Sequence, residues 1–511
     1  MAENERLMAG RLSDLADGSA MKVTVGKNDV LLVRRGSSVY ACGNNCPHYG
    51  GPLNEGTFGD DTVTCPWHNA SFRFTDGALT VPPALDDLPT YEVTVQNDEI
   101  FVGKVREPGI RMPDGDDRRS ILVVGAGAAG NACAEALRRN GFAGSITLVT
   151  RESDRPYDRP MLSKGFVSGG AQEEWLYLRS EEFYRSLRIS VKTGAAVERF
   201  DPSTRSVILS DGTTLTGDSV LLASGSRART VAIPGAERTG VFTLRTASDA
   251  RRIRAAAGTA KSAVIVGAGF IGMELAADLA QAKLAVNVVA PETEPMMAQF
   301  GQLIGARIRR THESYGVTFH LGCTVREISG GVEAERVLLS DGSVIAADMV
   351  VLALGALPET AYLEHSPALL ENGAVVVDEK LRTRADGVFA AGDIALVPYG
   401  SVGRFRIEHW VTSEAQGRHA AASMLGDQAP YELIPFFWTR QYDGSIKYLG
   451  FPGTADRIAY RGDPDNGAFL AGFYRGGHLF GAATVGMSSE LLSLENAIRG
   501  SDDLPFERFA R

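Results

Sequence analysis

Two short stretches in the first part of the chain combine cysteine with histidine at close spacing. The segments Cys-Pro-His at 46–48 and Cys-Pro-Trp-His at 65–68 each supply one thiolate and one imidazole. Both ligand types bind iron and zinc, but structural zinc sites usually group two cysteines before two histidines, whereas the two types alternate here. The alternation favours a 2Fe-2S cluster in which one iron has two thiolate ligands and the other has two imidazole ligands. The predicted metal ligands are Cys46, His48, Cys65 and His68.

The loops that follow these ligands resemble the cluster-covering loops of Rieske ferredoxins. The resemblance lies in Gly50-Gly51-Pro52-Leu53 and in Asn69-Ala70-Ser71-Phe72. Rieske proteins of respiratory complexes carry an additional cysteine in each loop, and the matching positions here are Gly51 and Trp67. The resemblance therefore implies a Rieske domain of the ferredoxin type, with no disulfide over the cluster.

Two later segments carry the glycine pattern of a dinucleotide-binding turn. Each follows an apolar run, at 120–124 and at 263–266, and each precedes a helical pattern. The first glycine allows a tight turn, the second lets the backbone approach a diphosphate at the helix N-terminus, and the third lets helix and strand pack closely. The predicted glycines are Gly125, Gly127 and Gly130 in the first segment and Gly267, Gly269 and Gly272 in the second.

The residues that follow the two glycine patterns are also similar. Each is followed by an Asp-Gly turn, at 211–212 and at 341–342, and then by an apolar strand that ends in glycine, at Gly225 and Gly355. A single glycine pattern would be weak evidence, but two modules with one internal plan predict a site for a bound flavin and a site for a nicotinamide cofactor. The alternative is a pair of such modules with no redox role.

Composition limits the other possible functions. The chain has 511 residues, a length that predicts about three or four domains. A net charge of -10 argues against binding to nucleic acid or to an anionic membrane surface. We expect no membrane span and a cytoplasmic protein, because no apolar run is long enough to cross a bilayer and the N-terminal residues lack an apolar signal core. Cys42, Cys133 and Cys323 form no CxxC pair, and we assign them no role.

Further motifs resemble those of a known flavoprotein family. Residues 119–511 resemble the oxygenase-coupled ferredoxin reductases and apoptosis-inducing factor, and the whole chain resembles the Rieske-fused, apoptosis-inducing-factor-like members. The resemblance covers nearly all of the chain. The motifs that carry it are Pro-Tyr-Asp-Arg-Pro-Met-Leu-Ser-Lys at 156–164, Val-Phe-Ala-Ala-Gly-Asp at 388–393, Glu-His-Trp at 408–410 and Pro-Phe-Phe-Trp-Thr at 435–439.

The resemblance implies roles for individual residues in FAD binding and catalysis. Asp393 is expected to accept hydrogen bonds from the ribityl hydroxyls of FAD. Arg159 and Lys164 are expected at the isoalloxazine ring, where positive charge stabilises reduced flavin, with Lys164 paired to Glu274. Lys164 and Glu274 are therefore the predicted catalytic residues, and Trp438 is expected to line the flavin. His409, from the Glu-His-Trp motif, is a further predicted FAD contact.

The acids expected to bind the nucleotide riboses depart from the usual pattern. The strand at 146–150 is followed by Arg151 and only then by Glu152, which we predict as the acid for the adenosine ribose of FAD. In the second module Ala290 stands where NAD enzymes typically place the ribose-binding acid, and Glu292 is the nearest candidate. No arginine occurs there to take a 2′-phosphate, which favours NADH over NADPH.

We therefore expect a multidomain protein in which an all-β Rieske domain precedes two Rossmann-like α/β domains and an α+β domain. Three strands and a final helix at 488–499 are expected in the last domain. The expected boundaries are 1–106 for the Rieske domain, 107–118 for a linker, 119–235 with 359–430 for the FAD domain, 236–358 for the NAD(P)H domain and 431–511 for the C-terminal domain.

The expected function is electron transfer from NADH through FAD to the chain's own Rieske cluster, and then to an external redox protein such as a terminal oxygenase. Two alternatives stay open at this point. One is a reductase of small molecules such as quinones, nitrite or oxygen. The other is a signalling or binding protein whose redox state controls its partners.

Overall fold

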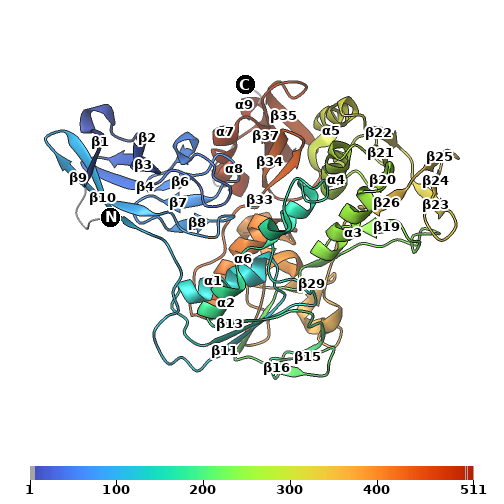
Figure 1. The fold of residues 1–511 in the computed structure, drawn as a ribbon, viewed down its shortest axis with the longest axis horizontal. Helices are drawn as coiled ribbons and strands as arrows, with labels where there is room; N and C mark the ends of the chain where they lie inside the picture. Colours follow the sequence, from blue (N-terminus) through green and yellow to red (C-terminus); the bar gives the residue numbers. More distant parts are fainter. Residues whose placement is uncertain (1–5, 501, 503, 510–511) are drawn as a thin grey trace. The chain divides into compact units, whose positions relative to one another are not determined.

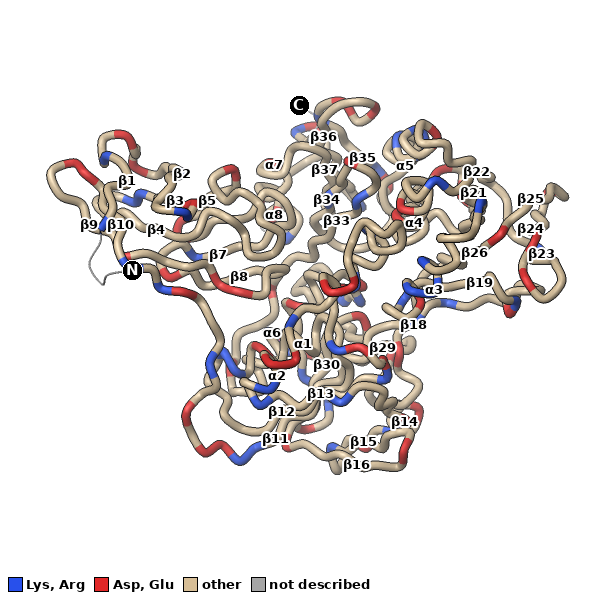
Figure 2. Tube along the Cα trace, viewed as in Figure 1, with Lys and Arg blue, Asp and Glu red and all other residues tan. Residues whose placement is uncertain are grey.

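The computed structural model describes residues 6–500, 502 and 504–509, and the chain divides into two compact units, Met1–Arg111 and Met112–Arg511. Each unit has its own hydrophobic core. Along the described trace of both units, Lys and Arg are interspersed with Asp and Glu (Figure 2). Among the described residues, no helix combines the length and the apolar content that crossing a membrane requires.

The first unit is all-β, as the sequence predicted (Figure 1). Its larger sheet has the strand order β1-β10-β9-β4-β3-β2, and its smaller sheet has the order β5-β6-β7-β8. Strand β3, which lies between β4 and β2, buries both faces: Leu31 and Val33 share a core cluster with Cys46 and Cys65, and Val30 and Leu32 pack on the other side. The strands are β1 (Leu7–Arg11), β2 (Ala20–Val25), β3 (Asn28–Arg35), β4 (Ser38–Gly43), β5 (Thr57–Phe58), β6 (Thr62–Thr64), β7 (Ser71–Arg73), β8 (Leu79–Val81), β9 (Thr90–Gln96) and β10 (Glu99–Arg106).

The second unit begins with a five-stranded parallel sheet of order β13-β12-β11-β17-β30. Its strand β30 comes from far along the chain and pairs with β17, so the chain returns to this first module after completing a second one. Helix α1 packs against helix α6, which follows β30. The elements are β11 (Ser120–Val124), α1 (Ala128–Arg139), β12 (Ser145–Val149), α2 (Glu181–Ser186), β13 (Ile189–Lys192), β14 (Val197–Asp201), β15 (Ser206–Leu209), β16 (Thr214–Thr216), β17 (Ser219–Leu222), β18 (Ser226–Ala228), β30 (Val388–Ala390) and α6 (Trp410–Met424).

The second module repeats this plan with a parallel sheet of order β19-β26-β20-β21-β22. Its strands are continuous apolar runs, because helices and a small antiparallel sheet cover the sheet on both faces. The predicted Asp-Gly hairpins are present in both modules. The elements are β19 (Val241–Thr243), α3 (Ala247–Ala257), β20 (Ser262–Val266), α4 (Phe270–Gln281), β21 (Ala285–Ala290), α5 (Met297–Ser314), β22 (Thr318–Leu321), β23 (Val325–Ser329), β24 (Arg336–Leu339), β25 (Val344–Ala346), β26 (Met349–Leu352) and β27 (Ala356–Pro358).

The last part of the chain forms an antiparallel sheet of order β33-β34-β37-β36-β35 with short helices beside it. The single helix predicted at 488–499 is wrong: the chain forms two helices, because Leu494 N donates to Leu491 O and tightens the turn between them. The elements are β33 (Phe436–Gln441), β34 (Gly444–Gly450), β35 (Arg457–Gly462), β36 (Phe469–Arg475), β37 (His478–Val485), α7 (Ser488–Leu492), α8 (Glu495–Arg499) and α9 (Phe506–Phe509).

Candidate functional site

The predicted metal ligands lie in two loops of the first unit. The two predicted imidazole ligands face one another, with His48 Nδ1 3.1 Å from His68 Nδ1, and the two predicted thiolate ligands, Cys46 and Cys65, are buried. Tight turns hold the loops, since Gly50 N donates to Cys46 O at 2.8 Å and Cys65 N donates to Ala70 O at 2.8 Å. The two nitrogens thus face one another. This donor set fits a 2Fe-2S cluster with one thiolate-bound and one imidazole-bound iron.

Gly51 has no room for a side chain beside this ligand set. A Cβ atom at this position would lie 2.7 Å from Cys65 Sγ. A cysteine there would need the loop to move, which agrees with the predicted ferredoxin type. Tyr49 and Trp67 flank the histidines with 46% of each residue exposed, and the Tyr49 ring centroid lies 4.0 Å from that of His48.

The second unit contains a cavity of about 350 Å³ at the end of β11. Helices α1, α4 and α6 and strand β33 contribute to its wall. Of the predicted FAD-binding residues all but Gly130 line it, and so does the predicted catalytic residue Glu274; the FAD-binding residues are Gly125, Gly127, Glu152, Arg159, Lys164, Asp393, His409 and Trp438. The lining also includes Arg245, Phe270 and Phe437, which sequence reasoning missed.

The glycines of the first module leave space where a diphosphate must approach. Gly125 has a φ of +106°, and a Cβ at Gly130 would lie 1.9 Å from Gly125 O. A Cβ at Gly127 would instead face open space, with Arg159 Nη2 as its nearest neighbour at 4.0 Å. Gly127 is also the N-cap of α1, so no cap side chain occupies the first N–H groups of the helix. The loop therefore fits an anionic diphosphate.

The second module repeats these constraints. A Cβ at Gly272 would lie 2.1 Å from Gly267 O, whereas a Cβ at Gly269 would meet nothing within 4 Å. Gly269 is the N-cap of α4. Both modules thus present the open N-terminus of a helix to a nucleotide.

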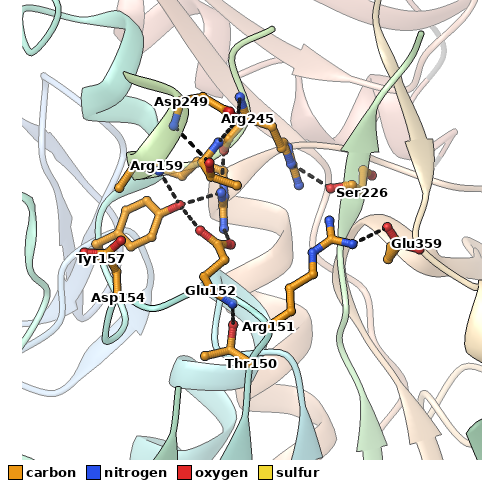
Figure 3. A network of polar contacts seen from close by, with 12 residues as sticks. Thr150, Arg151, Glu152, Asp154, Tyr157, Arg159, Ser226, Arg245, Asp249 and Glu359 are labelled. Carbon is orange, nitrogen blue, oxygen red and sulfur yellow. Dashed lines mark hydrogen bonds and ion pairs between the residues drawn. The ribbon is translucent and has the colours of Figure 1, made fainter. Parts of the chain in front are cut away.

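Glu152 and Arg159 belong to one partly buried polar network (Figure 3). Arg159 Nη2 donates to Glu152 Oε1 at 2.8 Å, and Arg159 Nη1 donates to Tyr157 Oη at 2.7 Å. The Tyr157 hydroxyl donates in turn to Glu152 Oε2. Arg159 also lies beside Gly127 of the phosphate loop, and its place at the isoalloxazine ring stays a prediction.

Asp393 occupies the carboxyl end of β30 and contacts three other elements. Its Oδ2 accepts from Arg245 Nη2 at 2.8 Å and from Ser226 Oγ at 3.0 Å, and its Oδ1 accepts from Ser413 Oγ at 3.3 Å. Burial alone would raise the pKa of Asp393, but Arg245 and the hydroxyl of Ser226 outweigh it and lower that pKa below its usual range. Asp393 is therefore ionised and can accept hydrogen bonds from a polyol.

Glu274 connects the three parts of the second unit. It lies on α4, and its Oε2 accepts from Lys164 Nζ at 2.8 Å and from Ser163 Oγ at 2.6 Å. Its Oε1 accepts from Thr439 Oγ1 of β33 at 2.8 Å. The predicted ion pair between Lys164 and Glu274 is present, and it positions the lysine ammonium at the cavity. Their catalytic role stays a prediction.

Aromatic side chains form the wall near Lys164. The Phe437 ring centroid lies 4.2 Å from that of His409 and 4.8 Å from that of Phe270. Burial lowers the pKa of His409 to about 4, so its imidazole is neutral near pH 7. Trp438 also lines the cavity, but successive side chains of β33 point to opposite faces and the Trp438 ring lies near Phe436.

The predicted ribose-binding acid of the second module lies at the end of β21. Glu292 is exposed there. The neighbouring Glu294 is buried and accepts from Arg309 Nε at 2.9 Å, and Arg309 Nη1 donates to Glu313 Oε1 at 3.0 Å. Arg309 was missed by sequence reasoning, and it is already paired with two carboxylates.

Comparison with known proteins identifies the domains. Residues 119–417 match the family of pyridine nucleotide-disulphide oxidoreductases, residues 5–92 match the Rieske [2Fe-2S] domain, and residues 436–510 match the reductase C-terminal domain. The chain therefore belongs to the pyridine nucleotide-disulphide oxidoreductase family.

Individual relatives show which members of this family the chain is similar to. Human apoptosis-inducing factor 3 is 36% identical over 96% of this chain and 84% of its own length. The ferredoxin reductase component of a chlorobenzene dioxygenase from a Cupriavidus species is 35% identical over 71% of this chain and 88% of its own. The crystal structure of the ferredoxin reductase for the CYP199A2 system from Rhodopseudomonas palustris superposes with a TM-score of 0.73 at 29% identity, covering 77% of this chain and 98% of that one.

These findings confirm the predicted family, fold class and cofactors. The protein is an NAD(P)H-dependent FAD oxidoreductase of the ferredoxin reductase type with a Rieske 2Fe-2S domain. Its cofactors are FAD, the Rieske cluster and NADH.

Proposed function

We propose that the protein transfers electrons from NADH through FAD to its own Rieske cluster, and from there to an external redox protein such as a terminal oxygenase. The observation that carries the proposal is the presence in one chain of a Rieske domain and of two dinucleotide-binding modules. When bound, FAD accepts a hydride as two electrons and releases electrons singly.

The residues of the chain have separate tasks in this function. The N-terminus of α1 and Arg159 neutralise the diphosphate of FAD, and Asp393 orients its polyol. Lys164 holds a positive charge at the flavin end of the cavity, where it favours the anionic reduced flavin. Glu292 binds the ribose of NADH and disfavours the 2′-phosphate of NADPH.

Glu274 links nicotinamide binding to the flavin site. It lies on α4, whose N-cap Gly269 would face the nicotinamide nucleotide in this proposal, and its carboxylate lies 2.8 Å from Lys164 Nζ of the first module. A nucleotide bound at the N-terminus of α4 would therefore contact the same helix that positions Lys164, the proposed catalytic residue. We propose that this contact aligns the two modules for hydride transfer.

The proposed acceptor is a protein. One relative is the ferredoxin reductase component of a chlorobenzene dioxygenase. That relative therefore works with an oxygenase, and we propose the same class of acceptor for this protein. In this chain a Rieske domain of the ferredoxin type is part of the reductase itself. The covalent link replaces a bimolecular encounter with an intramolecular one at high effective concentration.

The variant Cys65→Ser tests this route. It removes one cluster ligand but leaves the second unit intact, so FAD should remain bound and be bleached by NADH under anaerobic conditions. Reduction of cytochrome c, used as a one-electron protein acceptor, should fall to a small fraction of the wild-type rate. Cys42→Ala, which removes a buried cysteine that is not a ligand, is the matched control. Unchanged cytochrome c reduction in Cys65→Ser would contradict the route through the cluster.

A further inference from the structure

An ion pair spans the phosphate loop of the FAD module. Arg151 Nη1 lies 2.6 Å from Glu359 Oε2, and both residues line the same cavity as Gly125 and Gly127 (Figure 3). Arg151 stands where dinucleotide folds usually place the acid that binds the ribose. A cation therefore occupies a position at which the fold ordinarily has a carboxylate.

The strand order shows what this ion pair spans. Arg151 follows the end of β12, and β12 and β17 pair with β11 on opposite sides. Glu359 is attached to the β17 side, because Glu359 N donates to Gly225 O at 2.9 Å and Ser224 Oγ donates to Glu359 O at 2.7 Å. The pair therefore bridges the carboxyl end of β11, where Gly125 begins the phosphate loop.

The two partners differ in exposure and in the contacts that hold their backbone. Glu359 is held by the two hydrogen bonds above and by the pairing of β27 with β18, and its side chain is 15% exposed. The Arg151 side chain is 46% exposed and is the longer of the two. Its neighbour Glu152 points the other way, toward Arg159 and Tyr157. Arg151 is thus the more exposed partner, and Glu359 is the partner whose backbone is held on both sides.

We propose that Arg151 and Glu359 form a clasp over the adenosine diphosphate half of bound FAD and set the rate at which the cofactor leaves. A guanidinium has five N–H donors in a planar fork, so Arg151 can hold Glu359 and still donate to diphosphate or ribose oxygens. FAD can leave only after the ion pair opens. This inference goes beyond the proposed electron route and does not depend on it.

Release of FAD from the holoenzyme tests the clasp, because flavin fluorescence rises when the cofactor leaves. Arg151→Ala and Glu359→Gln should each release FAD about tenfold faster than the wild type, which corresponds to one ion-pair contact. The double variant should release it no faster than the faster single variant, because either change opens the same clasp. Arg151→Lys, which keeps the charge, should recover part of the slow release.

Two further measurements separate the clasp from a general loss of structure. The visible spectrum of bound flavin should be unchanged in all variants, because the clasp acts on the adenosine half. Arg185→Ala removes an ion pair with Glu182 on the exposed surface of α2 and should release FAD at the wild-type rate. Unchanged release in both single variants would overturn the clasp, and so would effects that multiply in the double variant. Neither outcome involves NADH or an acceptor, so the electron route is tested separately.

Discussion

The two nucleotide-binding modules share their glycine geometry but differ at the residues that follow the second strand. In the first module the charged side chains of this region are paired: Glu152 with Arg159, and Arg151 with Glu359. In the second module Glu292 is exposed at the end of β21. Because of this difference we call the first module closed and the second module open.

This difference corresponds to the different tasks of the two cofactors. FAD must stay bound through many turnovers, whereas NADH must enter and NAD⁺ must leave in each one. The fold supplies the same diphosphate site twice, and the side chains after the second strand decide whether the nucleotide is retained or exchanged. The following predictions test this comparison, from the largest expected effect to the smallest.

Substitution of the third glycine should disable one cofactor site at a time and leave the other intact. In Gly130→Ala the new methyl group would lie 1.9 Å from the backbone oxygen of Gly125, so the variant should be purified without FAD. Gly272→Ala creates the same clash in the second module, and this variant should keep FAD but lose its reduction by NADH. Flavin content and NADH bleaching measure the two effects. Gly269→Ala, which has room for its methyl group, is the folding control and should only raise the KM for NADH.

Loss of Lys164 should slow the chemistry without emptying either site. In Lys164→Ala the positive charge near the flavin is lost, and the rate of flavin reduction by NADH should fall by about a hundredfold. Lys164→Arg keeps the charge and should lose much less. Stopped-flow absorbance of the flavin under anaerobic conditions measures both rates. A wild-type rate in Lys164→Ala would show that this ion pair has only a structural role.

The open module should discriminate between the two nicotinamide cofactors. Glu292 would repel a 2′-phosphate, and Arg309 is already paired with Glu294 and Glu313. We expect kcat/KM for NADH to exceed that for NADPH by at least about tenfold. Glu292→Gln should reduce this preference, whereas Arg309→Ala should leave it in place. Equal or inverted preference in the wild type would remove Glu292 from its proposed role.

The closed module also contains a buried acid with a pH-dependent effect. Burial raises the pKa of Glu414 on α6 well above its usual value. The folded protein therefore favours the neutral form of Glu414. Its contribution to the free energy of unfolding is complete below the unfolded pKa of about 4.3. This contribution is lost as pH rises toward the folded pKa, at up to about 1.4 kcal/mol per pH unit.

The temperature at which heating releases FAD should therefore fall with rising pH above about pH 4.5. It should fall less in Glu414→Gln, which cannot ionise. Glu490→Gln, an exposed acid on α7, is the control and should follow the wild type. Parallel pH profiles for Glu414→Gln and the wild type would contradict the assignment of a neutral Glu414.

Much of this architecture could be predicted because its determinants are local. The glycine triads depend on contacts within one strand-turn-helix segment, and the four metal ligands lie in two short loops. The repeated Asp-Gly hairpins likewise depend on neighbouring residues. Each of these features leaves a pattern of spacing that identifies it without knowledge of the tertiary structure.

The remainder of the site depends on contacts between distant segments. Arg245 reaches Asp393, and Thr439 reaches Glu274, but arginine and threonine have no spacing that marks such roles. Phe437 was missed because only the orientation of β33 shows which of its side chains packs against His409. The proximity of Arg159 to Gly127 likewise depends on the fold of the loop after β12, and no spacing in the sequence marks it.

Anaerobic mixing of the wild-type protein with NADH tests the central claim most directly, since the flavin and the Rieske cluster can be followed in one stopped-flow experiment. The proposed route predicts that the cluster becomes reduced after the flavin, at a rate that Lys164→Ala slows in proportion to flavin reduction. If the cluster stays oxidised while the flavin is fully reduced, although titration shows that its potential is sufficient, the route from NADH through FAD to the cluster is wrong.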